Sequence, residues 1–418
     1  MRTVPGSMPP RPRPRSALDS GLGSGPDVEP GRTDAGGPPE GGRIAKAGPW
    51  VLAAAGVAGA VAAFVSRPSA AGAAAGQDWS PFVLVAGLLL IGLVADDDGL
   101  FAAAGTRLAR LTGSGIALFA GAAVLIGVVT AVLNLDTSVA FLTPVLVYTA
   151  RSRGIGEPAL LYGCLLLSNA GSLLLPGSNL TNLIVLGHLR LTGSGFLARM
   201  WLPALAALAV TAVVVAAAER RSLRADPAEP AAVEPVRPGV GLAAVLTATV
   251  LVLVLRSPAI PVAAVGVAAV GIHLARRRVT LGSATEVLGL PVLVGLFGVA
   301  VALGALGRVW SGPTELLAHL NSWGTAAVAA LSTIVVNNLP AASLLAARTP
   351  DHPFSLIVGL NLGPNLCVTG SLAWLLWLRA ARSAGARPSL GRASAIGLAA
   401  VPLSIAAALV CLALAGSL

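Results

Sequence analysis

Long apolar stretches alternate with short polar or Gly/Pro-rich breaks along most of the chain. Several approach the roughly 20 apolar residues that a helix needs to cross a bilayer core. Backbone groups in lipid must be satisfied within their own segment, so such stretches are helical. The pattern predicts an all-α polytopic membrane protein with about nine spanning helices. These lie near residues 49–66, 80–95, 158–187, 200–218, 239–255, 258–274, 288–307, 354–378 and 393–415.

Two further apolar stretches, residues 115–150 and 324–347, are interrupted near the middle. The interruptions read Asn134-Leu135-Asp136-Thr137 and Asn337-Asn338-Leu339-Pro340. Each stretch is predicted to be a re-entrant helical hairpin that enters and leaves the membrane on one side.

The remaining segments are polar or amphipathic. Residues 1–46 are rich in Pro, Gly, Ser and Arg without an apolar run, which predicts a disordered cytoplasmic tail and no secretory signal. The charged, proline-rich residues 219–238 indicate a cytoplasmic linker. This linker would separate a first membrane repeat, residues 47–218, from a second, residues 239–418. Residues 97–112 are expected to form a helix at the membrane interface.

The basic residues indicate the orientation. With the tail in the cytoplasm, most of the 28 Lys and Arg residues fall on that side of the membrane, as the positive-inside rule requires. Counting either hairpin as a full span would break this alternation. We therefore expect a multi-pass protein of the cell inner membrane, with a cytoplasmic N-terminus and an external C-terminus.

Composition excludes several function classes. Charged residues make up 11% of the chain, against about 25% in soluble domains. The net charge of +10 comes with only 4% aromatics and scattered basic clusters, so no nucleic-acid partner is expected. Cys164, Cys367 and Cys411 lack metal or disulfide spacing. Lys46 is the only lysine, which excludes a Walker A motif. No intramembrane His, Glu or Cys cluster has catalytic spacing, so we expect neither an enzyme nor a cofactor.

The two halves share an internal similarity. Residues 132–135 and 336–339 read VLNL and VNNL, and residues 173–178 and 366–371 read LLLPGS and LCVTGS. In both halves an interrupted hairpin precedes a span broken by small polar residues. An odd number of crossings separates the hairpins, so the pattern predicts an inverted repeat with two broken helices and a midplane site between them.

Four polar clusters therefore form the candidate site. Residues 168–172, 176–179, 361–365 and 369–371 are expected to be unwound, and unwound main chain in lipid needs a cavity, water or ligand to satisfy it. Such clusters can bind a small oxygen-rich solute. The alternative is that these small residues only mediate helix packing. The candidate substrate- and ion-binding residues are Asn134, Asp136, Thr137, Ser138, Ser168, Asn169, Gly171, Ser172, Ser178, Asn179, Asn337, Asn338, Asn361, Gly363, Asn365, Thr369 and Ser371.

Two side chains offer sharper chemistry. Asp136 lies between long apolar runs, whereas the other acidic residues are expected in the tail, in loops or at the interface. A membrane carboxylate suits coupling to H⁺ or Na⁺, although Asp136 could instead cap a helix at the hairpin tip. The Cys367 thiol could meet a soft trivalent metalloid, or it could be a small apolar filler.

At these residues the chain resembles the arsenite/antimonite permease family, within the ion transporter superfamily that includes sodium-coupled dicarboxylate and citrate carriers. The resemblance spans roughly residues 80–415. It implies a scaffold and a moving transport domain with alternating access, and a homodimer; it leaves open a soluble arsenical ATPase partner. Its motifs are residues 93–110, NLDTSVAFLTP at 134–144, SNAGSLLLPGSNLTN at 168–182, NNLP at 337–340 and NLGPNLCVTGSLAW at 361–374.

Two transport hypotheses follow. The first is export of a small oxyacid, arsenite or antimonite, coupled to proton influx, with Asp136 carrying the proton and the Ser/Asn/Gly clusters the solute. The absence of Arg and Lys from the hairpins and broken segments suits a neutral species. The second is a sodium-coupled symporter of dicarboxylate or citrate. From a different class, a structural scaffold or a membrane-embedded enzyme is the alternative.

Overall fold

The computed structural model describes residues 40–111, 113–187, 189, 191–224 and 239–416. By its contacts the chain divides into Met1–Ala45 and Lys46–Leu418. Helix α1 spans Glu40–Ser66, and its first residues are the only part of the first unit that is described. This helix therefore begins before residue 49, where the sequence pattern places the first span. The rest of the predicted tail, and the predicted linker from residue 225 to residue 238, lie outside the described residues. Everything below concerns the second unit.

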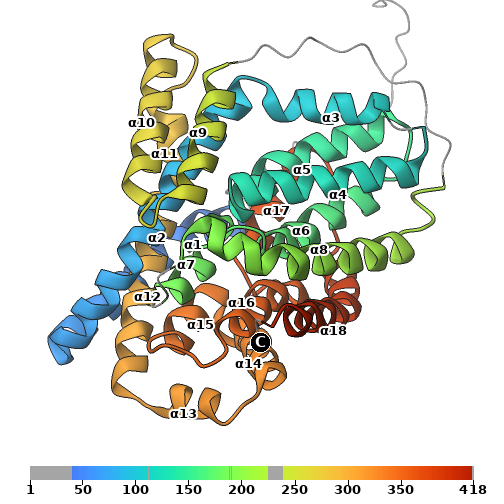
Figure 1. Ribbon diagram of the computed structural model, residues 1–418. Coiled ribbons are helices and arrows are strands. Elements are labelled where there is room, and N and C mark those ends of the chain that lie inside the picture. Colours follow the sequence, from blue (N-terminus) through green and yellow to red (C-terminus); the bar gives the residue numbers. More distant parts are fainter. Residues whose placement is uncertain (1–39, 112, 188, 190, 225–238, 417–418) are drawn as a thin grey trace, which may run out of the picture. The chain divides into compact units, whose positions relative to one another are not determined.

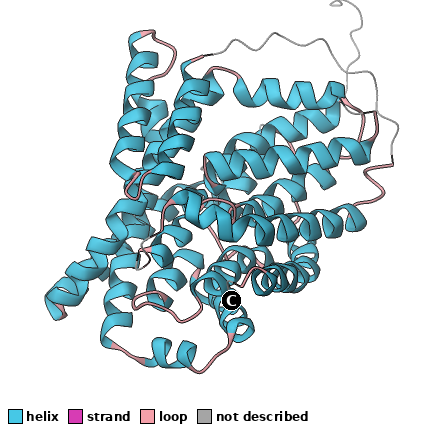
Figure 2. Ribbon diagram, viewed as in Figure 1, coloured by secondary structure: helices cyan, strands magenta, loops and turns pink. Residues whose placement is uncertain are grey.

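Regular structure in the described residues is entirely helical (Figure 2), which confirms the all-α class. Figure 1 labels the elements. After α1 come α2 (Pro68–Asp97), α3 (Leu100–Leu111), α4 (Gly115–Val132), α5 (Leu135–Ser152), α6 (Pro158–Gly171), η1 (Pro176–Ser178), α7 (Leu180–Leu186), α8 (Gly193–Ala218), α9 (Val240–Val254), α10 (Ala259–Ala275), α11 (Leu281–Leu288), α12 (Leu290–Val309), α13 (Gly312–Ala318), α14 (Ser322–Val336), α15 (Asn338–Leu345), α16 (Pro353–Leu362), η2 (Gly363–Leu366), α17 (Ala373–Ser383) and α18 (Leu390–Leu414).

Within the described ranges, six helical segments are long and apolar enough to cross a membrane. They are Gly48–Ser66, Pro68–Asp97, Gly115–Val132, Gly193–Ala218, Leu281–Val309 and Leu390–Leu414. Shorter apolar helices accompany them, as expected where a span is broken or re-entrant. The chain is a multi-pass membrane protein.

One boundary differs from the sequence prediction in a way that matters for the site. Helix α2 begins at Pro68, well before the expected residue 80, and so takes in the polar residues Gln77 and Asp78. Both side chains have partners on distant helices, described below. These partners offset the free-energy cost of burying the two polar side chains among apolar helices.

Both interrupted stretches are pairs of helices separated by a break, as predicted. The first break is at Asn134, whose Oδ1 accepts the N–H of Thr137 at 2.7 Å and so caps α5. The second is at Asn337, whose Oδ1 accepts the N–H of Leu339 at 3.4 Å. Asn337 has a φ of +75° and a ψ of 153°, a strained backbone conformation that residues other than glycine rarely adopt. That each pair enters and leaves the membrane on one side stays a prediction.

Both broken helices are also present, but their breaks lie later than expected. Ser168–Gly171 belong to α6 and Asn361 to α16, so these residues are helical and the prediction that they are unwound is wrong. The N–H of Ser172 still donates to the Ser168 carbonyl at 3.0 Å, which continues the helical pattern. The chain leaves the α-helix between α6 and α7 and between α16 and α17.

Helix α18 packs along α8 (Figure 1). It also packs against η2. The contact with η2 is made at Gly397, where a Cβ would lie only 1.8 Å from the Asn365 carbonyl oxygen. No larger residue fits there without moving one of the two segments. The glycine therefore sets how closely α18 approaches the second broken helix.

We expect Gly397→Ala to destabilise the protein by about 1–3 kcal/mol through overpacking, and to impair transport because η2 must shift. Gly391→Ala is the matched control, since it lies on the same helix and a Cβ there meets no atom within 4 Å. Thermal unfolding in detergent measures both variants. Equal melting temperatures for the two would contradict the tight packing described here.

Candidate functional site

The two broken helices meet in a cluster of amide and hydroxyl side chains, here called the amide cluster. It joins the first half of the chain, through α6, α7 and the segment between them, to α16 and η2 of the second half. Every member is at most 6% exposed. The members are Asn169, Ser172, Asn179, Thr181, Asn182, Asn361 and Asn365.

Asn361 is the hub of this cluster. Its Oδ1 accepts hydrogen bonds from Ser172 Oγ at 2.9 Å, Asn179 Nδ2 at 2.5 Å and Thr181 Oγ1 at 3.2 Å. Its Nδ2 donates to Asn182 Oδ1 at 2.6 Å and to the Ile357 carbonyl. One side chain of the second half thus holds both ends of the break in the first. Both polar atoms of the Asn361 side chain are satisfied, and satisfied buried hydrogen bonds of this kind rigidify the structure and specify one arrangement.

A second contact crosses between the halves beside the hub. Asn169 Nδ2 donates to Asn365 Oδ1 at 2.8 Å, and Asn365 Nδ2 donates to the Leu166 carbonyl at 3.1 Å. The Asn169 Oδ1 is buried and has no hydrogen-bond partner among the described residues. A buried amide oxygen without a partner is costly, so this acceptor is available to a bound solute or water.

The first hairpin tip forms a separate polar group. Ser138 Oγ lies 3.1 Å from Ser168 Oγ, and Ser178 Oγ donates to the Ala131 carbonyl at 3.2 Å. The described residues offer no partner to the buried Asn134 Nδ2 and Thr137 Oγ1. This tip therefore offers both a donor and a hydroxyl to a small polar molecule.

Asp136 lies in the first turn of α5 at this tip and is partly buried. Asn134 is the N-cap, so the alternative reading of Asp136 as the cap is wrong. In the part of the chain that the structure describes, no hydrogen bond or ion pair engages the Asp136 carboxylate. An unpaired carboxylate among apolar helices is a functional candidate.

The second hairpin tip is tied to the second break by main-chain contacts. The N–H of Asn338 donates to the Gly370 carbonyl at 2.9 Å, and Asn337 Nδ2 donates to the Thr369 carbonyl at 3.1 Å. Ser371 Oγ is buried without a partner among the described residues. Cys367 is only partly buried, and its Sγ lies 2.9 Å from Thr369 Oγ1.

The structure thus gathers the predicted residues into three groups rather than one. Asn169, Ser172, Asn179, Asn361 and Asn365 meet in the amide cluster. Asn134, Asp136, Thr137 and Ser138 lie at the first tip, near Ser168 and Ser178, and Asn337, Asn338, Thr369 and Ser371 lie at the second. No hydrogen bond between described residues joins the two tips directly.

The two glycines of the candidate set face the hairpins. A Cβ on Gly171 would lie 3.3 Å from the Gly127 Cα on α4, and one on Gly363 would lie 2.6 Å from the Ala330 Cα on α14. Each broken helix therefore packs closely on the hairpin of its own half. The small residues let the backbone of each broken helix approach its hairpin closely. The helix-packing interpretation of these glycines is therefore compatible with a polar site beside them.

Sequence reasoning missed three polar residues of this region. Thr181 and Asn182 lie in the first turn of α7, directly after its N-cap Asn179, and the closely spaced polar residues at 179, 181 and 182 were the available signal. Asp78 is only 2% exposed and interacts with Ser343 on α15 and with Arg308 on α12. The expectation that Asp136 is the only acidic residue inside the membrane helices is therefore wrong.

One cluster has the composition of a metal site. Ligand atoms of Asp97, Asp98 and His273 lie within 4.8 Å of one another. The Asp98 oxygens, however, already accept from Arg278 at 2.9 Å and from the Gly241 N–H at 2.7 Å, and His273 Nδ1 lies 2.9 Å from Asp97 Oδ2. The cluster connects α9 and α10 to the end of α2. The positive charge of Arg278, which lies against Asp98, argues against a bound cation.

Comparisons with known proteins agree with this architecture. The model of the citrate transporter family matches residues 44–362. An arsenical pump membrane protein of Escherichia coli is 26% identical over 335 residues, covering 72% of this chain and 78% of that protein. One from Shigella flexneri is 26% identical over 338 residues, with the same coverage. The crystal structure of the YdaH transporter of Alcanivorax borkumensis matches with a TM-score of 0.51 and 16% identity, over 83% of this chain and 87% of that one.

Proposed function

From the premise that this chain belongs to the citrate transporter family, we propose that it exports arsenite or antimonite in exchange for protons. At the coarser level it is a secondary transporter in a multi-pass membrane location, and it is not an enzyme. The arsenical pump membrane proteins among its relatives favour the metalloid oxyacid as substrate.

The observation that carries the proposal is the uncharged amide cluster between the two broken helices. Its side chains are amides and hydroxyls, and neither hairpin nor broken segment contributes Arg or Lys. Arsenous acid is neutral near pH 7 and presents three hydroxyl groups, which suit such donors and acceptors. The unpartnered Asn169 Oδ1 and Thr137 Oγ1 supply acceptors for them.

Coupling is assigned to Asp136. A carboxylate without a partner can take a proton from one side and release it to the other as the surrounding helices rearrange. Sodium remains the alternative ion, together with a citrate or dicarboxylate substrate, which the family description favours. The same proposal includes a cytoplasmic N-terminus, an external C-terminus and a homodimer, and it leaves open a soluble arsenical ATPase partner.

Arsenite accumulation in an arsenite-sensitive host tests the substrate assignment. Cells that express the chain should retain several-fold less arsenite than cells carrying an empty vector. Expression of the Asp136→Asn variant, which is expected to stay folded, controls for membrane protein load. Equal accumulation in expressing and control cells would contradict the assignment, and sodium-dependent citrate uptake would replace it with the alternative.

A further inference from the structure

Helix α7 is held by side-chain hydrogen bonds at both of its ends. At its start, Thr181 and the N-cap Asn179 donate to Asn361 in the amide cluster. At its end, the Ile184 carbonyl accepts a hydrogen bond from Gln77 Nε2 of α2 at 2.8 Å. The helix has only seven residues, about 10 Å along its axis, so a shift at one end displaces the other.

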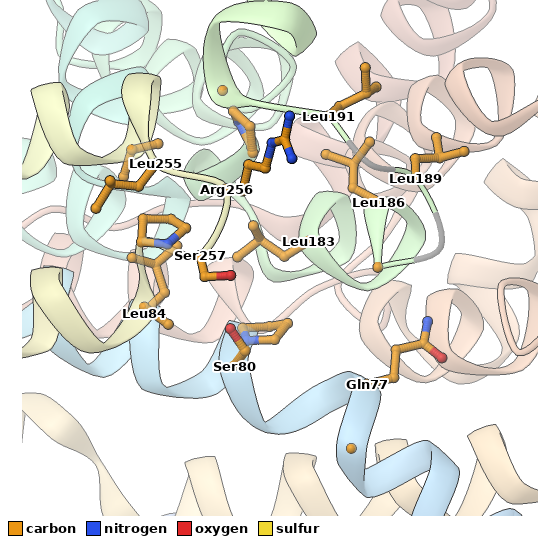
Figure 3. Close-up of a pocket in the computed structure, with 18 of the residues that line it drawn as sticks. Gln77, Ser80, Leu84, Leu183, Leu186, Leu189, Leu191, Leu255, Arg256 and Ser257 are labelled. Atoms are coloured by element: carbon orange, nitrogen blue, oxygen red, sulfur yellow. The ribbon is translucent and has the colours of Figure 1, made fainter.

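The same glutamine also reaches the end of the second hairpin. Its Nε2 donates to the carbonyl of Ala346, the C-cap of α15, at 3.3 Å. The last four carbonyls of a helix lack their usual N–H partner four residues further on. One amide group therefore supplies donors at the ends of two short helices, one from each half of the chain. Figure 3 shows the Gln77 side chain extending from α2 toward α7, on which Leu183 and Leu186 are labelled.

Arg308 determines which way the Gln77 amide faces. The guanidinium donates to Gln77 Oε1 at 2.5 Å and to the Gly304 carbonyl at 2.8 Å. A guanidinium carries donors only, and a carbonyl oxygen is an acceptor only. The opposite orientation of the amide would place its N–H groups against Arg308 and its oxygen against two carbonyls. The contacts therefore permit one orientation, with the donor side toward α7 and α15.

Asp78 balances the charge of Arg308. The Asp78 side chain is 2% exposed and interacts with Arg308 and with Ser343 on α15. The stem of Gln77 packs closely as well, because a Cβ on Gly187, the C-cap of α7, would lie 3.1 Å from Gln77 Cγ. These contacts leave the glutamine little freedom, so it connects α7 and α15 firmly to α12.

We propose that Gln77 is a positioning residue for the amide cluster. By fixing the end of α7 against Arg308, it holds the first turn of α7 within hydrogen-bond distance of Asn361. Hydrogen bonds weaken steeply with distance and angle, so a small displacement of α7 weakens the binding of the solute. The inference deepens the proposed function, since it rests on the amide cluster as the place where the solute binds.

Arsenite efflux from proteoliposomes, measured over a range of internal arsenite concentrations, tests the positioning role. Gln77→Glu keeps the acceptor for Arg308 but loses both donors, and Gln77→Met, which has a similar length, loses donors and acceptor. Both variants should raise the KM for arsenite by about tenfold, with an almost unchanged maximal rate per folded protein. Ser80→Ala, one turn further along α2, is the matched control and should keep the wild-type KM.

Gln77→Glu is the decisive variant. If it has the wild-type KM, only the acceptor for Arg308 matters and the proposal is wrong. A lower maximal rate at an unchanged KM would also overturn it, since a purely structural role changes only the amount of active protein.

A second measurement does not depend on the identity of the solute. Gln77 is the only glutamine of the chain, so ¹⁵N labelling of glutamine side-chain amides gives the nuclear magnetic resonance signal of this residue alone. Asn361→Ala, at the far end of α7, should shift this signal and speed hydrogen exchange of the amide by about tenfold, because α7 opens more easily. Thr181→Val, which keeps the side-chain shape, should shift the signal in the same direction. Asn321→Ala should leave it unchanged.

The two measurements separate the proposals. A Gln77 signal that is the same in wild type, Asn361→Ala and Thr181→Val would overturn the positioning role, whichever solute is carried. A wild type that moves no arsenite, with the signal shifted in both variants, would contradict only the proposed function.

Discussion

Replacing Asn361 by alanine is expected to reduce transport at least tenfold and to lower the free energy of unfolding by about 2–4 kcal/mol. The substitution removes the acceptor shared by Ser172, Asn179 and Thr181 and the donor to Asn182. All of these groups are buried, so each is left without a partner or must find water. Thermal unfolding and arsenite efflux measure the two effects.

Two further variants separate transport from folding. Asn321→Ala removes an exposed N-cap of α14 and should cost about 1 kcal/mol without changing transport. Ser172→Ala removes the hydrogen bond to Asn361 and should lower the free energy of unfolding by about 1 kcal/mol. This variant should still transport more slowly than the wild type. If Asn361→Ala transports at the wild-type rate, the amide cluster is not part of the transport path.

Asp136→Asn is expected to abolish transport driven by a pH gradient while leaving the protein folded. An amide of the same shape cannot carry a proton, and no ion pair of Asp136 is lost, because the described residues provide none. We expect at least tenfold slower gradient-driven efflux in proteoliposomes, with arsenite exchange across the membrane at equal pH retained.

Glu315→Gln provides the comparison for this variant. Glu315 is an exposed acid on α13, so its neutralisation removes the same charge without touching the tip of the first hairpin. Asp136→Glu should restore part of the coupling. Full gradient-driven efflux by Asp136→Asn would assign the proton to another group, and Asp78 would be the next carboxylate to examine.

Much of the fold could be predicted from the pattern of apolar and polar residues. The helix breaks at Asn134 and Asn337 coincide with the interruptions in the sequence, because asparagine caps the helix that follows each of them. The two broken helices were located by the same kind of signal. The residues at which these helices end could not be predicted. Ser168 and Asn361 remain helical because their side chains form hydrogen bonds with residues of other segments.

The remaining features depend on contacts between residues far apart in the sequence. The polar start of α2 is helical because Gln77 bonds with Arg308 on α12 and Ile184 on α7. No local pattern predicts those partners. For the candidate site, residue types indicated the polar clusters, and only the fold shows that Asn361 joins them.

Efflux from proteoliposomes tests most directly whether this chain is a proton-coupled transporter of metalloid oxyacids. Vesicles loaded with arsenite and placed in a more acidic medium should lose it several-fold faster than protein-free vesicles, and a protonophore should remove the acceleration. Arsenite loss that is independent of the chain and of the pH gradient, accompanied by citrate movement driven by sodium, would contradict the account.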